Sequence, residues 1–368
     1  MTLADRLPRF PWDLLAPYRE KAAAHPGGIV DLSVGTPVDP VPPVVRKALA
    51  SAADSPGYPA THGTARLREA AAGWLARRHG VRVDPAAVLP VIGSKEIVSS
   101  LPLLLGCGPG DAVVHPELAY PTYGVGARLA GADAVAADGL ASLGPRRVRL
   151  VWVNSPANPT GRVLPATHLR KMADWVRERG AVLAADECYL ELGWEDRPQS
   201  VLHPDVCGGS FEGLLGVYSL SKRSNLAGYR AGFVTGDPAL VASLLEIRRH
   251  AGMMMPGPVQ AAMAAALADD AHADRQRAVY QARRARLRTA LTGAGWQIDN
   301  SEAGLYLWAS RPGLDCWGGV QALAEAGILV APGDFYGPAG NHHIRLAFTA
   351  TDERIDAAAA RLADLPQS

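Results

Sequence analysis

The sequence predicts an α/β protein in which a large domain with a mostly parallel sheet between helices is followed by a smaller α+β domain. Two observations support this fold class. Between about residues 87 and 235, short apolar runs alternate with helical patterns, as in repeated βα units. Beyond about residue 270, a long arginine-rich helical pattern is followed by shorter strands. We expect an N-terminal arm belonging partly to the small domain (1–34), a large domain (35–272) and a small domain (273–368).

The strands of the large domain are expected where apolar runs end at polar or turn residues. They cover residues 87–92, 111–115, 147–154, 180–186, 214–220 and 229–235. Helices are expected from residue 93 and over 166–179. Since parallel strands alternate with helices, the sheet should be covered on both faces.

The small domain is expected to begin with a helix over about 273–291. Strands at 304–308, 328–330 and 344–348 follow, and a closing helix begins near Thr351. The proline-rich, irregular start of the chain is expected to pack with this domain.

Composition excludes several classes of partner. The formal net charge of +1 gives no general attraction to nucleic acid or to an anionic membrane. The apolar stretch at 101–105 is too short to span a bilayer, and Pro8 and Pro11 stand where a signal peptide needs an apolar run. The four cysteines form no CxxC pair and no metal set. We therefore expect a cytoplasmic protein without a metal, with reduced cysteines.

Lysine is rare in this chain, because only five of its 37 basic residues are lysines. Lys21, Lys47 and Lys171 lie in charged helical patterns typical of solvated faces. Lys95 and Lys222 instead follow apolar runs. Burying a lysine costs desolvation energy, so these two positions call for a functional reason.

Polar side chains follow five of the expected strands, where their carboxyl ends meet in one crevice. They are Ser94, Lys95, Tyr120, Asn154, Asn158, Asp186, Tyr189, Ser219, Ser221 and Lys222. The convergence of the whole set is more informative than any one member.

The chemistry of this set suits pyridoxal phosphate (PLP). A desolvated Lys222 can form a Schiff base with an aldehyde, and a buried Asp186 can hold a proton on a ring nitrogen. Ser219, Ser221 and Arg230 suit a phosphate group. The helix that starts at Gly93-Ser94-Lys95 could also receive phosphate, although a serine there is often only a cap. Taken alone, Asp186 could equally be a loop carboxylate and Lys222 a structural residue.

Eight motifs together resemble the fold-type I, aspartate-aminotransferase-like family over nearly the whole chain. They are SVGTP (33–37), GYPATHGTARLREA (57–70), GSKE (93–96), AYPTY (119–123), NSPANPTG (154–161), DECY (186–189), SLSK with GYRAG (219–232) and IRLAF (344–348). The resemblance implies a seven-stranded sheet, a PLP cofactor and a homodimer with active sites at the interface.

The resemblance also implies a role for each matched residue. Lys222 would bind the cofactor and shuttle the proton, and Asp186 would pair with the pyridine nitrogen. Asn158 and Tyr189 would bind the ring hydroxyl, and Tyr120 would stack on the ring. The residues expected at the phosphate are Ser94, Lys95, Ser219, Ser221 and Arg230, with Tyr58 reaching the phosphate of the other subunit. Gly35 would let the backbone approach the substrate, and Arg345 would bind the substrate α-carboxylate.

Within the family, stretches such as DECYLELGW (186–194) and HAGMMMPGPVQAAM (250–263) look most like actinobacterial N-succinyldiaminopimelate aminotransferases of lysine biosynthesis. This resemblance implies glutamate as amino donor. Lys95 and Arg128 are candidates for binding the distal carboxylate of the substrate. Arg223 would suit such a carboxylate too, or it is a surface charge.

Other functions stay open within the cofactor class. A related PLP enzyme recruited to specialised metabolism, or an aminotransferase for another amino acid, would use the same lysine and aspartate. A DNA-binding regulator would need a basic helix-turn-helix segment, whereas the aminotransferase pattern begins near residue 10. A nicotinamide dehydrogenase would need GxGxxG where GSKEIV stands.

Overall fold

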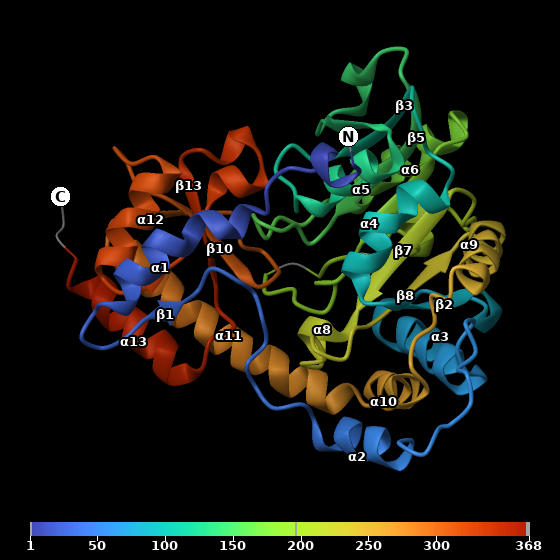
Figure 1. Cartoon of the computed structure of the whole chain (residues 1–368), viewed down its shortest axis with the longest axis horizontal. Coiled ribbons are helices and arrows are strands. Elements are labelled where there is room, and N and C mark those ends of the chain that lie inside the picture. Colours follow the sequence, from blue (N-terminus) through green and yellow to red (C-terminus); the bar gives the residue numbers. More distant parts are fainter. Residues whose placement is uncertain (1, 196, 366–368) are drawn as a thin grey trace.

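A seven-stranded sheet forms the centre of the larger part of the molecule (Figure 1). The computed structural model describes residues 2–195 and 197–365. The strands are β2 (Val88–Ile92), β3 (Asp111–His115), β4 (Asp133–Ala136), β5 (Arg147–Asn154), β6 (Val182–Asp186), β7 (Leu214–Ser219) and β8 (Ala231–Gly236). Their spatial order is β2-β8-β7-β6-β5-β3-β4, and only β8 runs antiparallel to its neighbours. The predicted mostly parallel sheet is confirmed.

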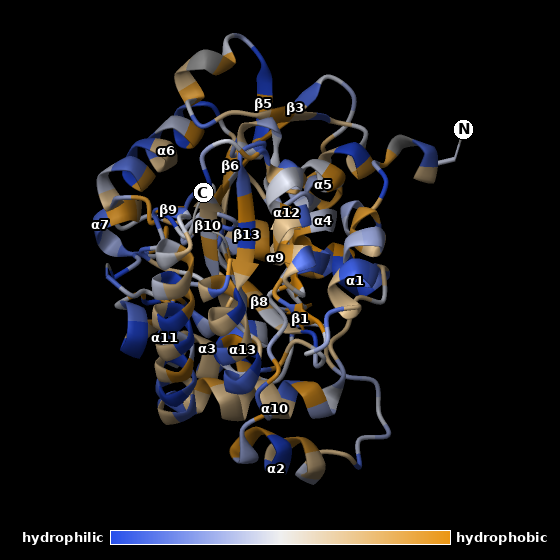
Figure 2. Ribbon diagram, turned by 90° about the vertical axis from the view of Figure 1, so that its left-hand side faces the viewer, coloured by the Kyte–Doolittle hydropathy of each residue, from blue (hydrophilic) through white to orange (hydrophobic). Residues whose placement is uncertain are grey.

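Helices cover both faces of this sheet. Side chains that alternate along each strand pack in turn against one helical layer or the other. One layer contains α4 (Ser94–Leu104), α5 (Thr122–Ala130) and α9 (Pro238–His250). The other contains α3 (Ala65–His79), α6 (Ala166–Glu178) and α10 (Gly257–Ala268), with α2 (Pro43–Ser51) packed on α10. Strand β8 is buried along its whole length, and Figure 2 shows orange segments among the strands between the two helical layers.

The second part of the molecule is built around a four-stranded antiparallel sheet. Its order is β12 (Ala331–Pro332), β13 (His343–Ala347), β10 (Tyr306–Ser310) and β9 (Gln297–Asp299). The helices α11 (Asp270–Gly293), α12 (Cys316–Glu325) and α13 (Asp352–Ala363) surround it. This sheet has its own apolar core, which is distinct from the two clusters of the large sheet.

The N-terminal segment lies against this second part. Helix α1 (Ala16–Ala23) packs on α12, and β1 (Val30–Asp31) pairs in parallel with β11 (Ile328–Leu329) (Figure 1). The remaining short elements are η1 (Ala4–Arg6), η2 (Pro11–Leu15), η3 (Pro85–Ala87), η4 (Leu140–Leu143), α7 (Pro204–Cys207), α8 (Leu220–Arg223), η5 (Gly333–Tyr336) and η6 (Pro338–Gly340). The domain boundaries at 34/35 and 272/273 stay predictions.

The two-residue strands β1 and β12 were not expected from the sequence, and neither were β4 and β9. Strands β4 and β9 are short, and both lie at an edge of their sheet with solvent-exposed positions. A strand that is only partly buried needs few apolar residues, so its sequence carries little signal. No helix in the described part of the chain is long and apolar enough to cross a membrane.

The end of β7 differs from the prediction in a way that places Lys222. The strand stops at Ser219, and Lys222 lies in the following short helix α8. The Ser219 hydroxyl accepts a hydrogen bond from the backbone N–H of Ser221 at 3.2 Å, which caps this helix. Strand and helix thus meet at a fixed turn, and the lysine follows one turn later.

Candidate active site

One cavity of about 470 Å³ lies at the carboxyl edge of the large sheet. Most of the predicted site residues line it, namely Gly35, Ser94, Lys95, Tyr120, Asn158, Asp186, Tyr189, Ser219, Ser221, Lys222, Arg230 and Arg345. Strands β2, β5, β6 and β7 all point their carboxyl ends to this edge. The shared edge explains why residues far apart in the sequence reach one cavity.

Asp186 is the last residue of β6 and is 5% exposed. Its carboxylate accepts hydrogen bonds from the Tyr123 hydroxyl at 3.0 Å and from the backbone N–H of Cys188 at 3.3 Å. Burial raises the pKa of this carboxyl, and its hydrogen bonds and Lys222 oppose that rise only in part. A protonated ring nitrogen placed against Asp186 would therefore be a favourable partner.

The backbone around Asp186 is fixed by asparagines from the neighbouring strand. Asn154, the last residue of β5, donates from Nδ2 to the Asp186 carbonyl oxygen at 2.8 Å. Its Oδ1 accepts the backbone N–H of Asn158 at 2.8 Å. These two bonds hold the loop that carries Asn158 beside the end of β6.

Lys222 faces Asp186 across the cavity from a different strand end. Its amine is half-buried and donates a hydrogen bond to the carbonyl oxygen of Gly35. A lysine amine that lines a cavity together with a buried carboxylate is an arrangement that suits Schiff-base chemistry.

The basic end of the cavity combines Arg230 with the start of α4. Arg230 has a left-handed backbone (φ 55°), and its Nη1 donates to the Ala227 carbonyl oxygen at 2.9 Å. Gly93 precedes α4 with φ 78°, and a Cβ there would lie 2.2 Å from Nη2 of Arg230. Only glycine therefore lets the guanidinium approach the helix N-terminus at Ser94, where an anion is favoured.

Arg345 is a buried cation with no carboxylate partner among the described residues. It is 2% exposed, and it donates to Asn158 Oδ1 at 2.9 Å and to the Ser33 carbonyl oxygen at 2.6 Å. Its Nε is buried without a hydrogen-bond partner. A buried guanidinium with neutral acceptors and a free N–H calls for an anionic ligand.

The mouth of the cavity is aromatic and basic. Lys95 lies with its Nζ 5.7 Å from the ring centre of Phe10 and 5.8 Å from that of Tyr120. Trp12 and Arg19 from the N-terminal segment also line the cavity. This contribution from residues 10–19 was not foreseen in the sequence.

Three predicted positions lie outside the cavity. Arg128 is exposed near the end of α5, so it is not a distal-carboxylate ligand in this cavity. Arg223 is 4% exposed, pairs with Glu191 and lies over the Trp74 ring, so both readings of it were wrong. Tyr58 is 96% exposed. Its expected contact with another subunit stays a prediction.

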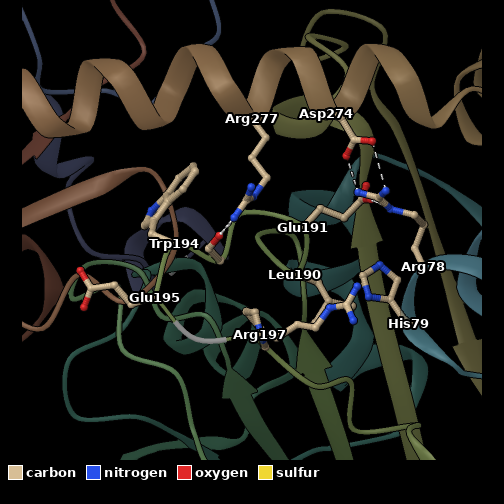
Figure 3. Close-up of a pocket in the computed structure, with 11 residues that line it drawn as sticks. Arg78, His79, Leu190, Glu191, Trp194, Glu195, Arg197, Asp274 and Arg277 are labelled. Carbon is tan, nitrogen blue, oxygen red and sulfur yellow. Dashed lines mark hydrogen bonds and ion pairs between the residues drawn. The ribbon is translucent and has the colours of Figure 1, made fainter.

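A second, polar cavity of about 350 Å³ lies between α3, α11 and the segment that follows β6 (Figure 3). Its charges are largely paired with one another. Arg78 bridges Glu191 at 2.9 Å and Asp274 at 2.6 Å, and Arg277 donates to the Gly193 carbonyl oxygen. None of the predicted site residues lines it.

The residues of the first cavity fit PLP. A buried carboxylate, an amine and a basic helix start with Arg230 match the ring nitrogen, the aldehyde and the phosphate of this cofactor. The unsatisfied Nε of Arg345 leaves a site for a substrate carboxylate beside it. The described residues contain no cluster of three or more His, Cys, Asp or Glu side chains suited to a metal.

Comparison with known families agrees with this chemistry. The family model "Aminotransferase class I and II" matches residues 28–362. This chain belongs to the class I and II aminotransferases. It is therefore a PLP-dependent aminotransferase with the fold-type I architecture, as the resemblance of its motifs predicted.

Two similar relatives have different names. The "4-dedimethylamino-4-oxo-anhydrotetracycline transaminase OxyQ" of Streptomyces rimosus is 62% identical over 97% of this chain and 99% of its own. "Probable aminotransferase Rv1178" of Mycobacterium tuberculosis is also 62% identical, over 97% of this chain and 85% of its own. Among solved structures, a "probable N-succinyldiaminopimelate aminotransferase" of Thermus thermophilus has a TM-score of 0.86 and 30% identity, covering 96% of this chain and 100% of the other.

Sequence reasoning missed several residues of this class I and II site. Tyr123 lies within the AYPTY motif, three positions after Tyr120, and its place in that motif was the available sequence signal. In the structure it is buried at the start of α5. Tyr306 and Tyr336 flank the Arg345 guanidinium, with ring centres 3.9 and 4.8 Å from its central carbon. Neither belongs to a motif whose spacing points to the site.

Proposed function

We propose that this aminotransferase converts N-succinyl-LL-2,6-diaminopimelate and 2-oxoglutarate to the corresponding oxo acid and glutamate, and runs the reverse reaction with glutamate as donor. An amino acid substrate is supported by Arg345, which lines the same cavity as Lys222 and Asp186. This buried cation has no carboxylate partner among the described residues, and its Nε has no hydrogen-bond partner. The proposal places this aminotransferase in the diaminopimelate pathway.

Each cavity residue then has one task. PLP, when bound, supplies an aldehyde that exchanges the amino group and a ring that accepts electrons. Lys222 removes the proton from the substrate α-carbon and returns it as general acid. Asp186 keeps the ring nitrogen protonated, and Arg345 binds the α-carboxylate as a two-pronged donor.

The remaining residues hold the cofactor in place. Asn158 and Tyr189 bind the ring hydroxyl, and Tyr120 covers the ring. The phosphate is bound by residues at the start of α4 and around α8, which are Ser94, Ser219, Ser221 and Arg230. Gly35 has no side chain where the substrate must pass, and a Cβ there would lie 2.4 Å from the Tyr306 hydroxyl.

The succinyl substrate is supported by the basic mouth of the cavity. Lys95 stands between two aromatic rings and can reach a carboxylate beyond the substrate α-carbon. The Thermus thermophilus structure, named as a probable N-succinyldiaminopimelate aminotransferase, agrees with this substrate. A Lys95→Met variant should raise KM for the succinyl substrate; a rise in the cofactor dissociation constant instead would assign Lys95 to the phosphate.

A second candidate function is the amination of a polycyclic ketone in specialised metabolism. The OxyQ relative is as identical to this chain as the Rv1178 relative is, and its name specifies such a substrate. Phe10 and Trp12 at the mouth offer aromatic surface to a flat, fused ring system.

A single-turnover absorption experiment separates these functions. PLP-loaded protein is mixed separately with glutamate and with N-succinyl-LL-diaminopimelate, and the loss of the visible cofactor band is followed. Conversion by both supports the succinyl-diaminopimelate function. Conversion by glutamate alone, followed by recovery of the band on adding 4-dedimethylamino-4-oxo-anhydrotetracycline, supports the second candidate. Absence of conversion by every compound contradicts both and points to other PLP chemistry.

We also propose that the protein is a cytoplasmic homodimer with active sites at the interface. Support comes from the exposed Tyr58 and from exposed apolar side chains of the N-terminal half: Phe10, Leu14, Val38 and Val44 are 40–55% exposed. Sedimentation equilibrium should give twice the chain mass, and Tyr58→Phe should weaken PLP binding; a monomer with full activity would contradict the proposal.

A further inference from the structure

Tyr306 occupies a position between the two functional ends of the cavity. It lies at the start of β10, is 4% exposed and lines the cavity, yet no motif or proposed role above includes it. Strand β10 pairs with β13, which carries Arg345, so the two side chains come from adjacent strands of the small sheet.

The ring of Tyr306 holds the guanidinium of Arg345. Its centre lies 3.9 Å from the central carbon of that group, and the Tyr336 ring lies 4.8 Å away on another side. A guanidinium against aromatic faces is held in one plane, which is the geometry that bidentate carboxylate binding needs. The two hydrogen bonds that Arg345 donates to neutral oxygens also orient the guanidinium, and the Tyr306 ring packed against it opposes its rotation out of that plane.

The hydroxyl of Tyr306 points to a second functional group. It lies 3.2 Å from the Tyr189 hydroxyl, and the two rings meet edge to face with their centres 5.9 Å apart. The groups that face the Tyr189 phenol are Tyr306, Cys188 and Arg345. Cys188 also forms a hydrogen bond with Tyr189, and the Tyr306 hydroxyl adds a contact from β10 that constrains the direction of the phenol.

We infer that Tyr306 is a positioning residue for transamination, which sets the plane of Arg345 through its ring and the direction of Tyr189 through its hydroxyl. Tyr306 therefore contacts both Arg345, which binds the substrate carboxylate, and Tyr189, which binds the ring hydroxyl of the cofactor. This inference rests on the proposed role of Arg345.

Two substitutions separate the ring from the hydroxyl. Tyr306→Phe keeps the ring and removes the bond to Tyr189, so KM for glutamate should stay within about twofold while kcat falls about 2- to 10-fold. The pH midpoint of the visible cofactor band should rise by about 0.3–1 unit, because Tyr189 loses the hydroxyl partner that holds its phenol in the direction of the cofactor ring. Tyr306→Leu removes the ring, and the dissociation constant of 2-oxoglutarate for the PLP-loaded protein should rise about 3- to 30-fold in calorimetry. That complex cannot turn over, since neither component carries an amino group.

A matched control is Tyr280→Phe, which removes another buried hydroxyl, bonded to Asn225 Oδ1 at 3.2 Å and outside the cavity. It should leave the band midpoint and the 2-oxoglutarate affinity at the wild-type values. If Tyr306→Phe matches this control in midpoint and kcat, or if Tyr306→Leu keeps wild-type affinity, the inference is overturned. Arg345→Ala tests the underlying role separately: unchanged 2-oxoglutarate affinity in that variant would refute the carboxylate site itself.

Discussion

Glu191→Gln should destabilise the protein strongly, although Glu191 lies outside the cavity that holds Lys222. The Glu191 side chain is 6% exposed and forms ion pairs with Arg223 and with Arg78. Figure 3 shows Glu191 beside Arg78. Arg223 is 4% exposed, and its other bonds go to neutral oxygens of Ser224 and Ala266. The substitution leaves a buried guanidinium without its anion, which costs about 3–5 kcal/mol of unfolding free energy.

The assay is urea unfolding of the PLP-loaded protein at fixed protein concentration. A matched control is Glu325→Gln, whose carboxylate is 60% exposed and pairs with Lys21 at 3.3 Å. The control should leave the unfolding midpoint unchanged. Combining Arg223→Met with Glu191→Gln should recover part of the loss, because the uncompensated charge is then absent. An unfolding midpoint of Glu191→Gln equal to that of the control would refute the reasoning.

The same pair predicts a pH dependence. Burial raises the pKa of Glu191, but Arg223, His79 and Arg78 outweigh burial and lower it below its ordinary value. A carboxyl with a lowered folded-state pKa stabilises the fold at pH values above its unfolded pKa of about 4.3. This contribution is lost as the pH falls through the lower folded-state value. The difference in unfolding free energy between wild type and Glu191→Gln should therefore be largest at neutral pH and should shrink below about pH 4.

Four further substitutions test the site itself. Lys222→Ala should fold but show neither the visible band of lysine-bound cofactor nor turnover; full turnover would refute the assignment. Asp186→Ala should still bind PLP but lose most exchange of the substrate α-proton with deuterated solvent, and unchanged exchange would count against its role. Tyr123→Phe removes a 3.0 Å bond to that carboxylate and should slow the same exchange about 10- to 100-fold; a wild-type rate would exclude Tyr123 from the site. Gly93→Ala puts a Cβ 2.2 Å from Arg230 at φ 78°, so the PLP dissociation constant should rise about 10-fold or more, as equilibrium dialysis would measure. A wild-type constant would mean that Arg230 moves away without consequence.

The sheet was predictable where its strands are buried on both faces. The apolar runs ending at His115 and at Asn154 give β3 and β5 with the predicted bounds. Helices α11 and α13 of the second part were placed within a few residues, whereas α12 was not predicted. Strands β4 and β9 escaped prediction because edge strands with exposed positions need little apolar sequence.

Arg223 marks the limit of reasoning from neighbours in the chain. From its position after Lys222, Arg223 was expected to be either a ligand for the substrate carboxylate or a surface charge. In the structure it is buried, pairs with Glu191 and does not line the cavity. Its partner Glu191 lies 32 residues away and comes from the segment after β6. No local pattern encodes which acidic residue will meet a given arginine.

The sequence by itself determined the cofactor class of this protein. Lys222, Asp186 and the polar residues after buried strands follow from local patterns, and parallel strands bring such ends to one edge. The tertiary structure decided what surrounds them. The Tyr123–Asp186 bond joins residues 63 positions apart, and the Arg345–Asn158 bond joins residues 187 positions apart. The first contact depends on how α5 packs against the large sheet, and the second on how the small sheet meets the loop after β5. The physical reason is that burial and pairing are properties of the folded neighbourhood rather than of the chain.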